Sequence, residues 1–283
     1  MQKFDENILR SMSRGLNINA ISSVANMFLE DVNSLTSQIL DAMKRVDLNY
    51  DISFFGAYDR GDIVSEKEHI SLAIILKDEE IYEETNQIGK YRTKHKRNKN
   101  SKLEEFKMLL IMMLQRYFNH KVNISLQNNA IIIDSYKFYN QNFKIYVFTQ
   151  SYTRKELLTI SSTDLKSCYF NLEDYTKNFN KKNELTDYNY SKICNIFKTL
   201  AMDLGISNDV LLIETYFYNI PNELFVGYLN EQIFKILNEY MFVSKTSFRS
   251  IGSNINIVND KFLINNNYFK ANQIIAKINH IFR

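Results

Sequence analysis

Two side chains in the segment FFGAYDRGDIVSEKEHISLAIIL, residues 54 to 76, have the chemistry of catalytic groups. His69 is a candidate metal ligand or general base, and Ser71 is a candidate nucleophile. A lone histidine is more often a structural polar group, and no His–Asp pair that would activate Ser71 can be identified. The carboxylates of the preceding loop, Asp59 and Asp62, are further candidates for binding a metal ion. None of these residues alone predicts a catalytic centre.

A second candidate surface is the strongly basic stretch from residue 90 to residue 102. Lys94, Lys96 and Arg97 stand near its centre, and clustered basic side chains gain from counterion release when they meet phosphate groups. Two interpretations stay open at this point. The stretch is either a solvated loop or a nucleic-acid-binding surface.

The pattern of apolar residues indicates the elements that must position these groups. Apolar residues three and four apart predict helices, and short or alternating apolar runs predict strands. Helices are expected over residues 19–46, 103–118, 186–203, 208–218, 222–243 and 270–281, with a helix cap at Asn222. Strands are expected at YDISFFG, HISLAIIL, NAIIIDSYKF and NFKIYVFT, the last two forming a hairpin closed by YNQN, and SIGSNINIVNDKFLINNNYF is expected to be an irregular or hairpin insertion.

Composition limits the class of protein. The chain has 283 residues, of which 45% are hydrophobic and 24% charged, as in ordinary folded proteins with a full core. A formal net charge of +3 does not by itself mark a nucleic-acid binder. The two cysteines lack close spacing, which fits a reducing cytosol, and no apolar run reaches the length of a membrane span. We therefore expect a cytoplasmic protein without a membrane partner.

The order of these elements and several short motifs resemble the DNA polymerase β-like nucleotidyltransferase superfamily, especially bacterial cyclic-oligonucleotide synthases and oligoadenylate-synthase-like proteins. GAYDRGD and EHISL match the family's Gly-Ser turn and its Ser-Asp-hydrophobic-Asp strand, and KIYVFT matches the strand of its third carboxylate. A helix with Lys198, then a helix with Glu214 that ends near Pro221, matches the family's C-terminal half. The resemblance extends from about residue 20 to residue 245.

The resemblance implies a nucleotide site in which Gly56, Ala57 and Tyr58 form the turn that faces the triphosphate. It also implies that Lys198 reaches phosphate groups from the second lobe. Ala57 departs from the family's serine and removes a hydroxyl group that would face the triphosphate. The expected ligand is a nucleotide, an oligonucleotide or RNA, held in the cleft between the lobes.

The three carboxylate positions of the family are degenerate in this chain. His69 and Ser71 stand at the paired acids, and Tyr146 stands at the third. Two-metal nucleotidyl transfer needs anionic oxygens that hold two Mg²⁺ ions, and these three side chains supply no negative charge. A register shift of one residue would bring only one acid, Glu68, to the active face.

Three functions remain open. The first is a noncatalytic nucleotidyltransferase fold, a pseudoenzyme that binds a nucleotide, oligonucleotide, RNA or partner protein. The second is an active nucleotidyltransferase that binds Mg²⁺ at a relocated site built from Asp62, Glu68 and Asp134. The third is a nucleic-acid-binding or scaffold protein that uses the basic stretch.

The first function is the one we predict. The expected fold class is α+β, with a nucleotidyltransferase-like lobe of mixed sheet and helices over residues 1–160 and a helical lobe over residues 161–283. No cofactor is expected, apart from Mg²⁺ if the second function holds. A role in bacterial defence or signalling is implied by the resemblance alone.

Overall fold

The computed structural model describes residues 5–16, 19–42, 49–65, 67–77, 97–127, 130–151, 157–160, 168–170, 172–206, 210–240, 248–249, 251–252 and 263–282. Contacts divide the chain into two compact units. The sheet unit comprises Asn17–Arg60 and His69–Asn171, and the helical unit comprises Met1–Leu16, Gly61–Glu68 and Leu172–Arg283. The helical unit thus includes two segments from the first quarter of the sequence, which a division at residue 160 does not express.

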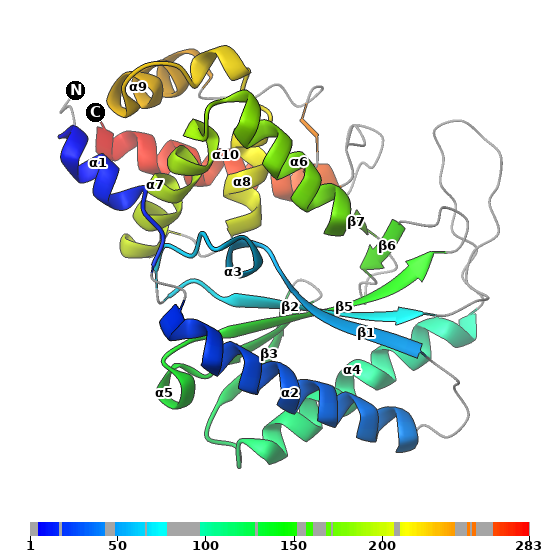
Figure 1. Ribbon diagram of the computed structural model, residues 1–283. Coiled ribbons are helices and arrows are strands. Elements are labelled where there is room, and N and C mark those ends of the chain that lie inside the picture. Colours follow the sequence, from blue (N-terminus) through cyan, green and yellow to red (C-terminus); the bar gives the residue numbers. More distant parts are fainter. Residues whose placement is uncertain are drawn as a thin grey trace. The chain divides into compact units, whose positions relative to one another are not determined.

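The sheet unit is built on a mixed sheet, in which seven strands are described (Figure 1). They are β1 (Asn49–Phe55), β2 (Ile70–Lys77), β3 (Asn123–Gln127), β4 (Ala130–Asp134), β5 (Phe143–Ser151), β6 (Leu157–Ile160) and β7 (Cys168–Phe170). Five strands follow the order β1-β2-β5-β4-β3, and β6 pairs with β5 and β7. The β2–β5 pair is parallel, whereas β1–β2 and β4–β5 are antiparallel. Strands β1 and β2 match the first two predicted strands, YDISFFG and HISLAIIL.

One face of this sheet packs against the helices α2 (Asn19–Ala42) and α4 (Arg97–Tyr117) (Figure 1). The ring of Phe28 on α2 stacks on Phe143 of β5, with 3.7 Å between the centroids. The hydroxyl group of Tyr117 donates to Asp31 over 2.7 Å and joins α4 to α2. Because side chains alternate along a strand, Lys144, next in sequence to Phe143, lies on the opposite face of the sheet.

The connection between β4 and β5 differs from the predicted hairpin. The two strands are antiparallel as predicted, but β4 ends at Asp134, and a short helix, α5 (Tyr136–Tyr139), replaces the end of the predicted strand. Side chains close this loop, since the Ser135 hydroxyl donates to the carbonyl oxygen of Gln141 over 2.9 Å. Asn142 Oδ1 accepts from the backbone N–H of Tyr136 over 3.1 Å. These local bonds stabilise a helical turn where apolar alternation alone favours a strand.

The helical unit is organised around α7 (Asn189–Asp203), which contacts five other helices. Those helices are α1 (Glu6–Met12), α6 (Leu172–Leu185), α8 (Val210–Tyr218), α9 (Leu229–Glu239) and α10 (Leu263–Phe282), and a short 3₁₀ helix, η1 (Asn222–Leu224), precedes α9. Residues from Ile193 to Lys198 are all buried, so α7 is enclosed on every side. The α+β fold class, with a mixed-sheet lobe and a helical lobe, is confirmed.

Two helix predictions in this unit were incomplete. The expected helix over residues 222–243 is split into η1 and α9, because Gly227 adopts φ +103° between them. Asn222 is not a helix cap, and its side-chain oxygen instead accepts from Lys182 Nζ over 2.6 Å. Helix α6 was not predicted, since it is rich in polar residues and buries only a narrow stripe that includes Tyr175 and Phe179. Helix α10 begins within the segment expected to be an insertion.

Candidate functional site

A tight glycine turn follows β1. Gly56 has φ +78°, a backbone conformation that favours glycine, and its carbonyl oxygen accepts from the N–H of Arg60 over 3.1 Å. The turn continues into α3 (Ala57–Arg60), in which Ala57 is buried. The ring of Tyr58 contacts Phe54 with 4.6 Å between the centroids. The predicted turn is therefore present at Gly56, while its contact with a triphosphate stays a prediction.

Of the positions predicted to be degenerate, Ser71 and Tyr146 lie on one face of the sheet, opposite the face that packs against α2 and α4, and His69 directly precedes β2. Ser71 of β2 pairs with Lys144 of β5, and Ala73 pairs with Tyr146. The backbone N–H of Ile70 donates to the carbonyl oxygen of Asn142 over 2.9 Å at the start of the β2–β5 ladder, and His69 directly precedes Ile70 in the sequence. We call His69, Ser71, Lys144 and Tyr146 the site face.

Lys144 is the member of the site face that sequence reasoning missed. Alternation along KIYVFT places residues 144 and 146 on the same face, and this was the available signal. Which of the two lies beside Ser71 depends on the pairing of β2 with β5, two strands far apart in the sequence. The ladder places Lys144 beside Ser71 and Tyr146 two residues further along.

Aromatic contacts hold Tyr146. Its ring meets Phe55 of β1 edge to face, with centroids 5.2 Å apart. Lys144 Nζ lies 4.9 Å from the centroid of the Tyr146 ring, within the range of a cation–π interaction. The Tyr146 ring thus supports the Lys144 ammonium group on this face of the sheet.

Lys144 is the charged residue among the four members of the site face, and the ladder also brings Asp134 to this face, two residues beyond Ile132, which pairs with Lys144. Burial and, to a smaller extent, the nearby Lys144 lower the pKa of His69 from 6.5 to about 4, although Asp134 acts in the opposite direction. The imidazole is therefore neutral at physiological pH, and its Nε2 has no hydrogen-bond partner among the residues that the structure describes. Neither β2 nor β5 contains an acidic residue. Asp134, at the exposed end of β4, accepts from Asn123 over 3.2 Å.

The acids proposed for a relocated metal site lie in different surroundings. Glu68 is buried in the helical unit, where its Oε1 pairs with Lys198 Nζ at 3.3 Å and its Oε2 accepts from the N–H of Val64 over 3.0 Å. Burial raises the pKa of Glu68, and Lys198 opposes that shift. Asp62 contributes its backbone carbonyl oxygen to Lys198, 3.3 Å away. Among the described residues, no three His, Cys, Asp or Glu side chains are grouped so as to hold a metal ion.

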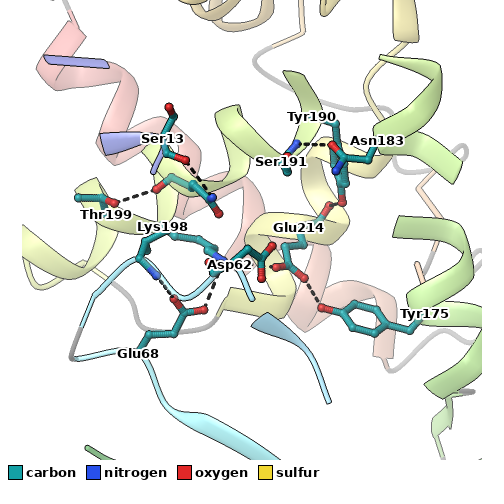
Figure 2. A network of polar contacts seen from close by, with 12 residues as sticks. Ser13, Asp62, Glu68, Tyr175, Asn183, Tyr190, Ser191, Lys198, Thr199 and Glu214 are labelled. Carbon is teal, nitrogen blue, oxygen red and sulfur yellow. Dashed lines mark hydrogen bonds and ion pairs between the residues drawn. The ribbon is translucent and has the colours of Figure 1, made fainter. Parts of the chain in front are cut away.

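Lys198 forms a buried ion triad with Glu68 and Glu214, which we call the Lys198 triad (Figure 2). Its Nζ lies 3.6 Å from Glu214 Oε1, and all three side chains are almost completely buried. The hydroxyl group of Tyr175 donates to Glu214 Oε2. The triad fixes the segment Gly61–Glu68 onto the helical unit. A contact between Lys198 and phosphate stays a prediction, and the observed contacts indicate a structural role.

The basic stretch contributes little to the described structure. Lys94 and Lys96 lie outside the described residues, and Arg97 is the first residue of α4. The predicted nucleic-acid contact of these three residues therefore stays a prediction. Of the helices that are described, none combines the length and apolar character that a bilayer crossing requires.

Comparison with known proteins identifies the fold. No model of a known protein family matches this chain, and no curated protein matches it. Solved structures do match. A CdnE c-UMP-AMP synthase from Rhodothermus marinus, solved with Apcpp and Upnpp, has a TM-score of 0.62 and 14% identity, covering 97% of this chain and 96% of its own. A CdnE cyclic dinucleotide synthase from Elizabethkingia meningoseptica, solved with GTP and Apcpp, has a TM-score of 0.60 and 18% identity, covering 98% and 99%.

A third similar structure is DncV from Vibrio cholerae in its GTP-bound form. It has a TM-score of 0.53 and 11% identity, covering 87% of this chain and 73% of its own. All three are cyclic dinucleotide synthases of the DNA polymerase β-like nucleotidyltransferase class. This chain therefore has the nucleotidyltransferase fold of those enzymes, as the resemblance implied.

Proposed function

We propose that this chain binds nucleotides through the site face and does not transfer nucleotidyl groups. One observation carries the proposal: Ser71 and Tyr146, at two of the positions predicted for the family's carboxylates, lie on one face with the Lys144 ammonium group, which pairs with Ser71. The similar CdnE and DncV structures contain GTP or nucleotide analogues, which supports a nucleotide as the ligand. The turn at Gly56 is retained beside this face.

The charge of Lys144 opposes the binding of a divalent metal ion. Side chains on neighbouring strands are about 5 Å apart. At that distance an ammonium group repels a divalent ion by roughly 7 kcal/mol at an effective dielectric constant of about 20, and by about a quarter of that in bulk water. Octahedral Mg²⁺ sites in proteins depend on anionic oxygen ligands, and His69 and Ser71 provide none. The same surroundings favour an anionic ligand.

A relocated metal site would require rearrangement of the Lys198 triad. The Glu68 carboxylate already accepts an ion pair and a backbone hydrogen bond, and releasing it would leave Lys198 with Glu214 as its one carboxylate in the triad. Breaking a buried ion pair costs about 3–5 kcal/mol. A noncatalytic protein is therefore the function that the geometry supports better.

Radiolabelled ATP, GTP, CTP and UTP, offered singly and mixed with Mg²⁺ or Mn²⁺, test the proposal together with equilibrium binding. We expect binding of at least one nucleotide and no new phosphodiester product by chromatography. Metal-dependent product that disappears in His69→Ala or Ser71→Ala would overturn the proposal. Product that disappears in Asp134→Asn or Glu68→Gln would establish the relocated site instead.

RNA binding through Lys94, Lys96 and Arg97 stays a separate prediction, tested by the salt dependence of binding. A protein partner and a role in bacterial defence are also predictions. The E. coli CdnC that is similar to this chain, with a TM-score of 0.57, was solved in complex with a HORMA protein.

A further inference from the structure

We propose that Lys144 takes the charge role of a divalent metal ion, so that the site face binds the phosphate groups of a nucleotide without metal. This inference rests on the proposed function and names the group that replaces the metal. It concerns residues of the sheet unit alone.

The first support is the position of Lys144 in the ladder. Phe55 of β1 pairs with Ser71 of β2, and Ser71 pairs with Lys144 of β5, so the three residues form one row across three strands. Paired residues lie on the same face of a sheet. The turn at Gly56 begins one residue beyond Phe55, at the end of this row. A phosphate chain bound along the turn would therefore lie beside Ser71 and Lys144.

The second support is the balance of charge. Lys144 adds one positive charge, and the imidazole of His69 is neutral because burial and Lys144 both lower its pKa. Asp134 lies on the same face, two residues beyond Ile132, which pairs with Lys144, but it is exposed at the end of β4, where its carboxylate accepts a hydrogen bond from Asn123. An ammonium group binds phosphate as a point charge, whereas a carboxylate site needs metal ions to do so.

The third support is the way in which Lys144 is held. Its side chain is half-buried and its Nζ lies 4.9 Å from the Tyr146 ring centroid. Phe55 also contacts the Tyr146 ring, edge to face. A lysine supported by an aromatic ring loses less conformational freedom on binding than a fully solvated lysine.

Isothermal titration calorimetry with ATP, GTP, CTP, UTP and inorganic tripolyphosphate, in buffer with EDTA and no divalent metal, tests the inference. We expect at least one nucleotide to bind and tripolyphosphate to compete with it. Lys144→Gln should weaken that binding by roughly tenfold or more, as expected when a charged hydrogen bond is lost. Lys144→Arg, which keeps the charge, should change it by less than about threefold.

Lys121→Gln is the matched control, because Lys121 is an exposed lysine of the same unit, two residues before β3. It should leave affinity unchanged, and circular dichroism should show that all variants are folded. Nucleotide binding that requires Mg²⁺, that is unaffected by Lys144→Gln, or that tripolyphosphate does not compete with would overturn the inference while leaving the proposed function intact. If no nucleotide binds with or without metal, both the inference and the proposed function fail.

Discussion

Replacing Lys198 by methionine tests whether the Lys198 triad stabilises the helical unit by charge or merely by packing. At 3.3 and 3.6 Å, the attractions of Lys198 to Glu68 and Glu214 are each about 5 kcal/mol at an effective dielectric constant of about 20. Desolvation offsets much of this, so the net loss is smaller. In Lys198→Met a buried carboxylate can lose its unpaired charge by binding a proton. The free energy of that protonation at the ambient pH then sets how far the variant is destabilised.

The proton cost depends on pH in a calculable way. From the ordinary glutamate pKa of 4.5, protonating one carboxylate costs about 4 kcal/mol near pH 7.5 and under about 1 kcal/mol near pH 5. Loss of Lys198 removes an interaction that lowers the pKa of Glu68, so the folded-state pKa rises further. A raised folded-state pKa gives stability that is present below pH 4.5 and lost as pH increases. The variant should therefore be destabilised by about 4 kcal/mol near pH 7.5 and by much less near pH 5.

Urea unfolding followed by circular dichroism at both pH values measures this difference. Lys192→Met on the same helix is the control, since Lys192 is half-buried and bonds to Asn189 over 3.1 Å without a charged partner in that bond. It should cost less than about 1 kcal/mol at either pH. Equal destabilisation by Lys198→Met at both pH values would show that packing dominates, and the electrostatic reasoning would be refuted.

Two further predictions concern stability. Because the pKa of His69 falls from 6.5 to about 4 on folding, the unfolding free energy should be highest above about pH 6.5 and decline by up to about 3 kcal/mol as pH falls towards 4. In His69→Asn this decline should be smaller. An equal decline in the variant would contradict a buried neutral imidazole at His69. The Glu6 carboxylate accepts the N–H groups of Leu229 and Asn230 at the start of α9, each over 3.2 Å, so Glu6→Ala should lower the unfolding free energy by about 0.5–2 kcal/mol in thermal or urea unfolding. Glu239→Ala at the exposed end of α9 should change it by less than about 0.5 kcal/mol, and equal effects would contradict a capping role for Glu6.

Sequence patterns predicted the elements with wide apolar faces and missed those with narrow ones. Helix α2 and strand β2 carry continuous apolar periodicity, so their positions were clear. Helix α6 is mostly polar and was missed, because its few buried residues depend on packing against α7. The short helix α5 depends on side-chain hydrogen bonds of Ser135 and Asn142, which apolar spacing does not report.

The candidate site could be predicted in its residue types but not in its pairing. Motif order alone located Gly56, His69 and Ser71 on or beside the first two strands. Lys144 required the register of β5 against β2, which is fixed by contacts between distant segments. The environment of Lys198, which the resemblance implied to reach phosphate groups, required the knowledge that Gly61–Glu68 packs within the helical unit, where Lys198 is buried between two acids.

The motif EHISL contributes residues to both units, because one segment of the helical unit ends at Glu68 and the sheet unit resumes at His69. Its first residue, Glu68, is bound to Lys198 in the helical unit, and its next residue, His69, lies with Lys144 on the site face of the sheet unit. Three carboxylates about 5 Å apart would repel one another by roughly 3 kcal/mol per pair at an effective dielectric constant of about 20 unless metal ions were bound. With a neutral imidazole, a hydroxyl group and an ammonium group in that region, this face needs no metal to relieve repulsion. The proposed function therefore requires no bound metal at this face, and the glycine turn and Lys144 support phosphate as the proposed ligand.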